Sequence, residues 1–302
     1  MLPSISFHPN TRLAYKIVFG TLVTVFAVVA LMNLPTHVAD DIVFSQQDGA
    51  DFEVMVMAAD GSELRQLTNN DADDWGAVWT ADQSQIVFHS DRDGNYGIYR
   101  MNADGSDVVR LTPMDWVARF PTVSNQGQIA FHALVNDNWD LYMVELDGSD
   151  LVRLTYDGAA DFGPAFSPDG SKIAFHTLRN GRENIMVLNL DEWCNERLTM
   201  LSSDSNHIDV WPSWSPDGER IVFHSERDGE SEIYTMAADG SDVRQLTNNN
   251  VIDRVARFSP DGERVVFRSE RNGDSEIFSM ALDGSDVQQL TSDALMNYHP
   301  DW

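Results

Sequence analysis

Aspartate recurs at one position in a series of similar segments along this chain. When the segments are aligned, five of the six copies carry Asp or Asn there and one carries Ala: Asp74, Asp161, Asp209, Asp253, Asn297 and Ala118. Carboxylates that converge on one point can hold Ca²⁺ or attract basic side chains, so Ca²⁺ is the one cofactor that this pattern suggests. Alternatively, each Asp caps its own loop by accepting hydrogen bonds from backbone N–H groups.

Histidine recurs at a second position of the same segments. Four copies carry His and two do not: His89, His132, His176 and His224, with Ser45 and Arg268 in the others. Four imidazoles in one register suggest a metal site. However, they fall in the middle of separate predicted strands, which we expect to lie away from any central channel. We therefore favour a hydrogen bond from each imidazole to an Asp or to the backbone of the neighbouring repeat.

The segments are interrupted once, by four additional residues within residues 200–211. This link carries His207 and Asp209 and ends at Trp211. Aromatic residues cluster in the equivalent links and loops, beside His299: Trp75, Trp116, Trp139, Phe162 and Tyr298. Aromatic rings next to acids bind sugars or cationic side chains, or they simply pack the loops together. The acidic run Asp71–Asp74 is predicted to be a solvated loop.

Two sequence markers show how these residues are positioned. A Phe that ends an apolar triplet recurs at Phe44, Phe88, Phe131, Phe175, Phe223 and Phe267, and a Leu-Thr pair recurs at residues 67, 111, 154, 198, 246 and 290. Both series advance by 44, 43, 44, 48 and 44 residues. A period in the low forties with four short strands per unit predicts a blade of a β-propeller.

The repeat from Trp211 to Thr247 shows the expected parts of one blade. A short strand at 211–214 is followed by a Ser-Pro-Asp-Gly turn and by strands at 220–225, 232–236 and 243–247. The turn has Pro to set φ and Gly to accept a positive φ, while Asp239-Gly240 is typical of a tight hairpin.

The motifs Trp-Ser-Pro-Asp-Gly, Ile-Val-Phe-His-Ser and Ile-Tyr-x-Met-x-x-Asp-Gly-Ser closely resemble the TolB-type propeller repeat, also called the WD40-like or PD40 repeat. The resemblance covers about residues 40–302 and implies an all-β, six-bladed propeller of four-stranded antiparallel blades. Its repeats lie at about 42–85, 86–128, 129–172, 173–220, 221–264 and 265–302. Because the repeats begin at a second strand and end after a first strand, we expect residues 298–302 to complete the N-terminal blade and close the ring.

The first 39 residues differ from the repeats. Arg12 and Lys16 precede an apolar run at 17–34, which is typical of a secretory signal or an uncleaved membrane anchor. We favour the anchor, because the run is long enough to span a bilayer. In either case we expect the propeller to be periplasmic or extracellular. The single cysteine, Cys194, excludes an intrachain disulfide and is predicted to be a small apolar residue.

The net charge of the chain limits the kinds of molecule that it can bind. The chain carries −28, and the repeats alone carry −30 because both leader charges are positive. Such a surface repels nucleic acid and anionic lipid and favours basic partners. We therefore predict a monomeric, non-catalytic platform for a basic protein or peptide. The resemblance also implies a rival, a metal-dependent lyase or hydrolase that acts on carbohydrate in the channel and would need several His or Gln ligands there; only His207 and His299 are near.

The predicted binding residues lie at one mouth of the expected channel. They are the repeated Asp and Asn residues and the nearby aromatic and histidine side chains: Asp74, Asp161, Asp209, Asp253, Asn297, Trp75, Trp116, Trp139, His207, Trp211 and His299. If a metal is bound, the four aspartates are its predicted ligands, and no catalytic residue is predicted.

Overall fold

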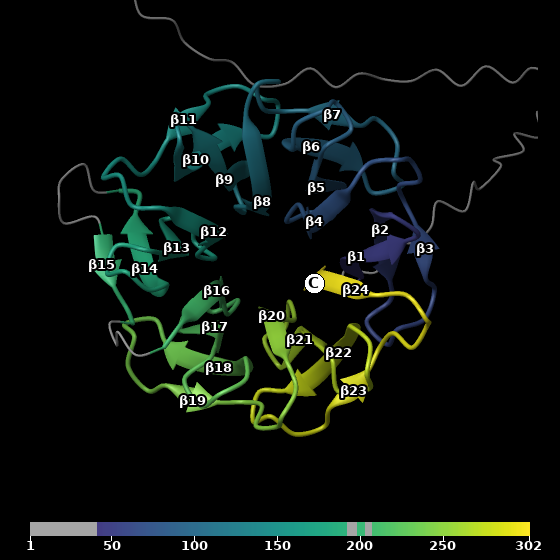
Figure 1. Ribbon diagram of the computed structural model, residues 1–302, viewed down its shortest axis with the longest axis vertical. Helices are drawn as coiled ribbons and strands as arrows, with labels where there is room; N and C mark the ends of the chain where they lie inside the picture. Colours follow the sequence, from purple (N-terminus) through teal and green to yellow (C-terminus); the bar gives the residue numbers. More distant parts are fainter. Residues whose placement is uncertain (1–40, 192–197, 203–206) are drawn as a thin grey trace, which may run out of the picture. The chain divides into compact units, whose positions relative to one another are not determined.

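The computed structural model describes residues 41–191, 198–202 and 207–302. The apolar run at 17–34 and Cys194 lie outside these residues. The described residues form strands and turns, and none of them belongs to a helix able to span a bilayer. Within the described residues, twenty-four strands form six antiparallel sheets of four, arranged as blades around a central axis (Figure 1). The predicted six-bladed propeller is confirmed.

Each blade has one inner strand at the axis and three strands further out (Figure 1). The inner strands, in ring order from blade 1 to blade 6, are β24 (Asn297–Asp301), β4 (Asp74–Trp79), β8 (Val117–Val123), β12 (Asp161–Phe166), β16 (Asp209–Trp214) and β20 (Asp253–Phe258). The second strands are β1 (Ile42–Asp48), β5 (Gln85–Ser90), β9 (Gln128–Val135), β13 (Lys172–Thr177), β17 (Arg220–Ser225) and β21 (Arg264–Ser269).

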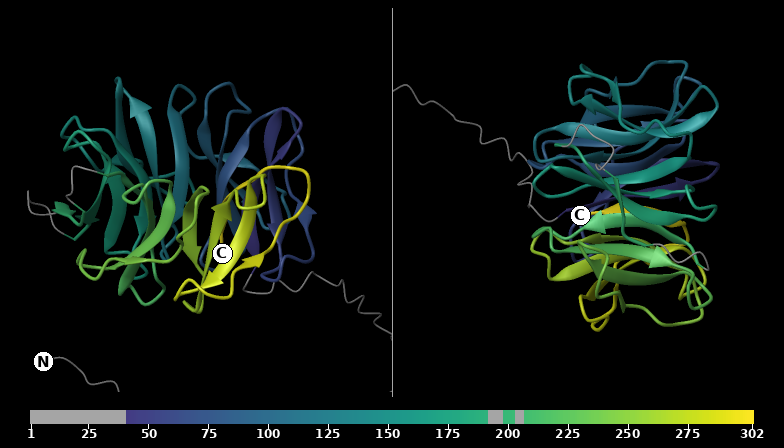
Figure 2. Two further views of the ribbon diagram at one scale, coloured as in Figure 1. Left: turned by 60° about the horizontal axis from the view of Figure 1, so that its bottom comes forward. Right: turned by 90° about the vertical axis from the view of Figure 1, so that its left-hand side faces the viewer.

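The third strands are β2 (Asp51–Met57), β6 (Gly97–Asn102), β10 (Asn138–Glu145), β14 (Asn184–Asn189), β18 (Glu232–Ala237) and β22 (Glu276–Ala281). The outermost strands are short: β3 (Arg65–Gln66), β7 (Val109–Arg110), β11 (Val152–Arg153), β15 (Leu198–Met200), β19 (Arg244–Gln245) and β23 (Gln288–Gln289). Figure 2 shows all strands running between two layers of loops.

The ring is closed by strands from opposite ends of the described chain. The C-terminal strand β24 pairs with β1, and Ser45 lies opposite Tyr298 while Gln46 lies opposite Asn297. The predicted closure is therefore confirmed. It removes two free strand edges, which would otherwise be open to pairing with other chains.

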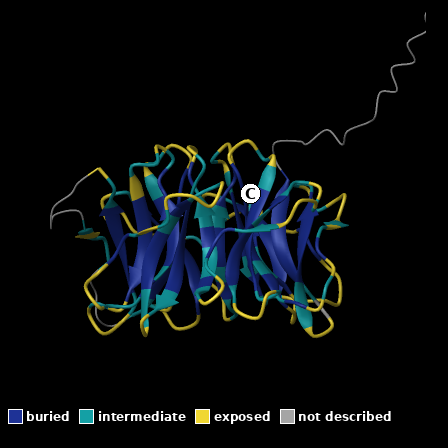
Figure 3. Cartoon of the chain, turned by 90° about the horizontal axis from the view of Figure 1, so that it is seen from above, coloured by how far each residue is buried: buried dark blue, intermediate teal, exposed yellow. Residues whose placement is uncertain are grey.

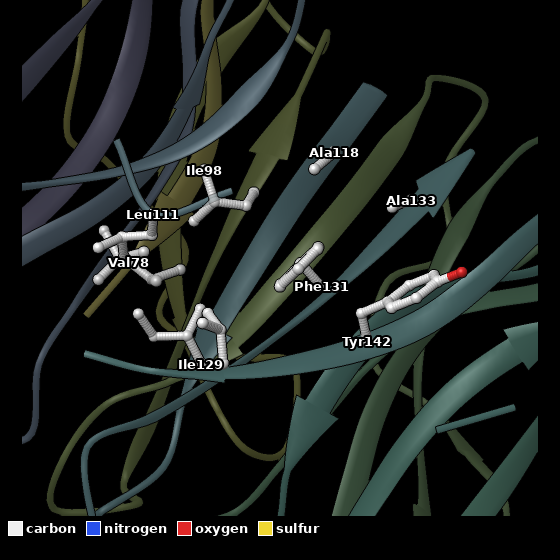
Figure 4. Packing of buried hydrophobic residues seen from close by; sticks show 10 residues of the cluster. Val78, Ile98, Leu111, Ala118, Ile129, Phe131, Ala133 and Tyr142 are labelled. Atoms are coloured by element: carbon white, nitrogen blue, oxygen red, sulfur yellow. The ribbon is translucent and has the colours of Figure 1, made fainter. Parts of the chain in front are cut away.

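The hydrophobic core lies between blades rather than within one of them. The repeated Phe of every second strand is completely buried. Figure 4 shows one interface, where Val78 and Ile98 of blade 2 pack against Ala118 and Phe131 of blade 3. Buried residues fill the strands, and exposed residues gather in the loops at both faces (Figure 3). Because each second strand is covered on both sides, it has apolar residues on both faces.

The Thr of the repeated Leu-Thr pair closes five of the six blades at the outer edge. In five blades the Thr hydroxyl accepts a hydrogen bond from the backbone N–H of the third strand, as from Ile233 to Thr247 at 2.9 Å. Blade 4 uses Ser202 in the same way. The marker thus supplies an acceptor where the short outer strand leaves an N–H group unpaired.

Candidate functional site

The repeated aspartates begin the inner strands and are buried inside the blades. Asp74, Asp161 and Asp253 are 0% exposed and Asp209 is 1% exposed. Each is paired with the arginine that stands two residues after the second strand of its own blade: Arg92 to Asp74 at 2.8 Å, Arg179 to Asp161 at 2.6 Å, Arg227 to Asp209 at 2.8 Å, and Arg271 to Asp253 at 3.0 Å. These carboxylates are therefore neutralised within their blades.

These aspartates do not cap their loops in the predicted way, which was to accept hydrogen bonds from backbone N–H groups. The partners of Asp74 and Asp253 are arginine and asparagine side chains, with Asn70 and Asn249 each donating at 2.7 Å, rather than backbone N–H groups. Asn297 takes the same place in blade 1 and donates to Glu276 at 2.9 Å. In the described part of the chain, no group of three or more His, Cys, Asp or Glu side chains is arranged to hold a metal ion.

Counted from the position of the repeated Asp, which is Ala118 in blade 3, the third residue of each inner strand forms a bulge that turns toward the axis. All six have a positive φ, between 49° and 62°: Gly76, Phe120, Gly163, Trp211, Val255 and His299. This region is uncommon for residues other than Gly, and strained for a β-branched residue such as Val255. The bulge explains the register shift that every pairing of an inner strand with its second strand shows.

Three of these residues meet across the axis and close the channel. Phe120 of blade 3, Trp211 of blade 5 and His299 of blade 1 have ring centroids 4.6 to 5.3 Å apart. We call these three residues the plug. The intervening blades contribute Gly76, Gly163 and Val255, so bulky and smaller residues alternate around the ring.

The glycines are required by the plug. A Cβ atom on Gly76 would lie 3.1 Å from the Phe120 ring, and one on Gly163 would lie 3.2 Å from the Trp211 ring. Both would also crowd a histidine at 3.0 Å or less. The small residues therefore leave the space that the plug rings occupy.

The repeated histidines lie directly behind this wall. In each of four blades the His Nδ1 accepts a hydrogen bond from the backbone N–H of the bulge residue in the next blade: Phe120 to His89 at 3.3 Å, Gly163 to His132 at 3.2 Å, Trp211 to His176 at 3.4 Å, and Val255 to His224 at 3.4 Å. In blade 1 the Ser45 hydroxyl accepts from Gly76 at 3.1 Å. The predicted bond to a neighbouring backbone is confirmed.

The prediction that the four repeated histidines lie away from the channel is wrong, because the rings of His89 and His132 contact the plug residue Phe120. Burial lowers the pKa of all four histidines, and lowers those of His176 and His299 to about 3. A lowered pKa keeps the imidazole neutral, and a neutral imidazole can accept a hydrogen bond at Nδ1. The direction of the pKa shift is therefore consistent with the hydrogen bonds that these histidines accept.

The other predicted site residues are distributed around the start of the inner strands. Trp75 packs on Phe52 and Tyr298, with ring centroids 4.0 and 5.4 Å apart, and it also contacts the His299 ring. Trp139 packs on Phe162 and His132. His207 Nε2 lies 3.4 Å from a carboxylate oxygen of Asp209.

Two expectations about this region need correction. Trp116 packs against Tyr142 and the core between blades 2 and 3, so it is separate from the other rim aromatics. In the acidic run, only Asp71 is exposed, since Asp73 accepts a hydrogen bond from Tyr96 and Asp74 is buried.

We call the face where the inner strands begin the acidic mouth. It includes the loops that enter the inner strands and those that join second to third strands. Among the residues described there, ten exposed acids are accompanied by one exposed arginine, Arg182: Asp71, Asp93, Asp115, Asp137, Asp157, Glu226, Asp228, Glu230, Asp274 and Asp293. The negative charge that a partner would meet comes from these loops and not from the repeated aspartates.

The opposite face, where the inner strands end in turns such as Ser215–Gly218, we call the turn mouth. It contains a cavity of about 500 Å³. Sequence reasoning missed this cavity and the plug residue Phe120. The available signal was a break in the repeat: the third and fifth positions of the inner strand vary, whereas the first is nearly constant. Counted again from the position of the repeated Asp, the fifth residues are Val78, Thr122, Ala165, Ser213, Arg257 and Asp301.

Comparison with known proteins agrees with this geometry. A family model described as the TolB beta propeller domain, PD40, matches residues 37–133 and 199–302. The Tol-Pal system protein TolB of Bordetella parapertussis is 34% identical over 150 residues, which cover 50% of this chain and 34% of the relative. The match therefore spans about a third of that relative's length.

Two solved structures share the fold. TolB from Acinetobacter baumannii superposes with a TM-score of 0.76 at 20% identity, over 87% of this chain and 66% of the other. A putative TolB from Agrobacterium tumefaciens gives a TM-score of 0.70 at 20% identity, over 83% of this chain and 88% of the other.

Proposed function

Because this chain belongs to the family of TolB β-propeller domains, we propose that it is a non-catalytic platform that binds a basic protein or peptide at its acidic mouth. We propose in addition that it acts in the periplasm or at the extracellular face. The relatives named TolB and the charged, apolar leader support that location.

Both faces of the propeller expose more acids than bases, so the observation that carries this proposal is the combination, at the acidic mouth, of exposed acids with aromatic side chains. Ten exposed acids surround aromatic side chains that are partly open, such as Trp75 and Tyr298. Exposed carboxylates steer a cationic partner and set the rate of association, while aromatic rings give contact area and stack with guanidinium groups. The Arg268 guanidinium already lies 4.5 Å from the Tyr298 ring centre, which illustrates that geometry.

The plug favours the hypothesis that a partner binds at the surface of the acidic mouth over the hypothesis that a reaction takes place in the channel. Its three rings contact one another across the axis, so a ligand at the acidic mouth meets a closed aromatic floor. The rival metal-dependent enzyme needs converging ligands, and the described residues contain no such group. His299 is packed among aromatic rings, and His207 lies against Asp209.

Four exposed loop acids without hydrogen bonds in the described structure provide a direct test. We would combine Asp71→Asn, Asp115→Asn, Glu230→Gln and Asp274→Asn in one protein. The matched control makes the same change of charge on the opposite face: Glu63→Gln, Asp150→Asn, Glu219→Gln and Glu263→Gln. All eight positions are exposed.

Binding of a fluorescein-labelled peptide rich in Arg and Trp is measured by anisotropy at low and at physiological salt. The first variant should bind about tenfold more weakly at low salt, since four exposed charges at about 0.2–1 kcal/mol each contribute about 0.8–4 kcal/mol together. At physiological salt the control should change by less than about threefold, because its charges lie on the opposite face, at a distance greater than the Debye length of about 8 Å. At low salt it should lose less affinity than the first variant. Equal losses in both variants, or no binding by the parent protein, would overturn the proposal.

A further inference from the structure

The cavity at the turn mouth has two charged side chains in its floor. Arg257 of β20 and Asp301 of β24 occupy the fifth position of adjacent inner strands, where the other four blades have small uncharged residues. Their side chains are 17% and 20% exposed, and Arg257 Nε lies 3.5 Å from Asp301 Oδ1. The two charges thus balance each other at the edge of the cavity.

Neither group is saturated by the protein. A guanidinium has five N–H donors, but within the described residues Arg257 makes one hydrogen bond, from Nη1 to the carbonyl oxygen of Ala256 at 3.2 Å. Asp301 Oδ2 accepts from the backbone N–H of Trp79 at 3.2 Å. Its Oδ1 accepts no hydrogen bond from the part of the chain that the structure describes, and is near Arg257 only as an ion pair. The floor therefore offers unused donors beside an unused acceptor.

The remaining walls suit a small flat group. Four of the six inner strands end in an aromatic residue, and Trp302 directly follows β24. Trp214, Phe258 and Trp302 are among the aromatic residues that line the cavity. A volume of about 500 Å³ lies within the usual range for small-molecule sites. The plug separates this cavity from the acidic mouth. At the rim, Asp82 is held by Thr80 and Ser84, whose hydrogen bonds lower its pKa, so it remains ionised at neutral pH.

We propose that this cavity binds a small uncharged ligand that carries a hydrogen-bond acceptor and a donor on one edge, as an amide does. Its carbonyl oxygen would accept from Arg257, its N–H would donate to Asp301, and its apolar part would pack on the aromatic wall. A carboxylate would satisfy Arg257 but meet the charge of Asp301, and an ammonium group would have the opposite problem. An amide satisfies both without adding charge. This site is at the other end of the channel and is independent of partner binding at the acidic mouth.

Three ligands of similar size test this chemistry: benzamide, benzoate, which has nearly the same planar shape, and benzylamine, which is a cation at neutral pH. Their binding to the folded protein is measured by isothermal titration calorimetry at pH 7.5. We expect benzamide to bind at least about tenfold more tightly than either ion, because each ion leaves either Arg257 or Asp301 without a complementary group. If either ion binds as tightly as benzamide, or if benzamide does not bind at millimolar concentration, the proposal is wrong.

Substitutions then test the contributions of Arg257 and Asp301 to ligand binding one at a time. Arg257→Gln should weaken benzamide binding at least about tenfold. Asp301→Asn should reverse the preference, so that benzoate binds more tightly than benzamide, because Arg257 then lacks its counter-ion. Arg254→Gln, on the same strand but at the acidic mouth, is the matched control and should leave benzamide binding unchanged. Near-ultraviolet circular dichroism verifies that each variant is folded.

An equal effect of Arg254→Gln and Arg257→Gln would contradict the assignment, as would an Asp301→Asn variant that keeps the parent's preference. If the parent protein binds benzamide but not the peptide, only the proposed function is rejected. If it binds the peptide at the acidic mouth but not benzamide, only this inference is rejected.

Discussion

The two mouths of the propeller are built from the two ends of the same six strands, yet they treat charge differently. At the acidic mouth the first residue of the strand is nearly constant, and each Asp is paired with an arginine of its own blade. At the turn mouth the fifth residue varies, and Arg257 meets Asp301 from the neighbouring blade with hydrogen-bonding capacity to spare. The comparison teaches that repeated polar residues here stabilise the scaffold, while unrepeated ones are free to bind.

The strongest test of this contrast is the removal of a repeated aspartate. Asp74→Ala leaves Arg92 without its carboxylate and should lower the free energy of unfolding by about 3–5 kcal/mol, as is usual when one partner of a buried pair is lost. Urea denaturation followed by fluorescence measures it. Asp71→Ala, three residues away and exposed, should change the same quantity by less than about 0.5 kcal/mol.

The same reasoning predicts that Ca²⁺ does not replace the arginines. Millimolar Ca²⁺ should leave the melting temperature of the parent protein unchanged, because its carboxylates are already paired. A rise with Ca²⁺ that Asp209→Asn and Asp253→Asn abolish would restore the calcium hypothesis.

The plug keeps the two mouths separate, and a glycine beside it provides the next test. Gly163→Ala adds a Cβ atom 3.2 Å from the Trp211 ring at a φ of 54°, and should cost about 2–3 kcal/mol of stability through crowding and backbone strain. Gly181→Ala is the control, because its φ of 79° is also positive but nothing lies within 4 Å. It should cost about 1 kcal/mol. Equal costs would mean that the channel wall is not tightly packed.

A smaller effect is expected from Asp301 as the pH changes. Burial raises the pKa of this carboxyl from 3.8 to about 6, although Arg257 lowers it in part. Between these two values the folded protein keeps a proton that the unfolded chain has lost, so this group stabilises the fold at low pH and loses that contribution as the pH rises through about 6.

The difference in unfolding free energy between the parent protein and Asp301→Asn should therefore change by about 2 kcal/mol between pH 4.5 and pH 7.5, with the parent relatively more stable at the lower pH. Taking this difference removes the contributions of other titrating groups. A difference independent of pH would show that Asp301 is well solvated or fully compensated by Arg257.

The smallest effect concerns the exposed acids of the acidic mouth. The combined variant Asp71→Asn, Asp115→Asn, Glu230→Gln and Asp274→Asn should unfold within about 1 kcal/mol of the parent, because isolated surface charges contribute little to stability. Thermal unfolding measures it. A large loss of stability would mean that these loop acids hold the scaffold, as the repeated aspartates do, and the distinction between the two sets would fail.

Much of the fold was predictable because the repeat is strong. The Phe and Leu-Thr markers set one register for six copies, and the position of the first and last strands predicted the closure that β24 and β1 make. The arginine partners of the aspartates were not predicted, although each stands 18 residues after its Asp. Sequence spacing alone does not show that the turn after the second strand returns to the start of the first.

The sequence by itself determined the blade, its strands and turns, and the number of copies, because each depends on contacts between residues close along the chain. The tertiary structure decided which side chains meet at the axis. Phe120, Trp211 and His299 come from alternate blades, and Arg257 lies beside Asp301 because the strands bearing them are neighbours in the closed ring. These contacts depend on the curvature and closure of the ring, and so does the division of the channel into two mouths.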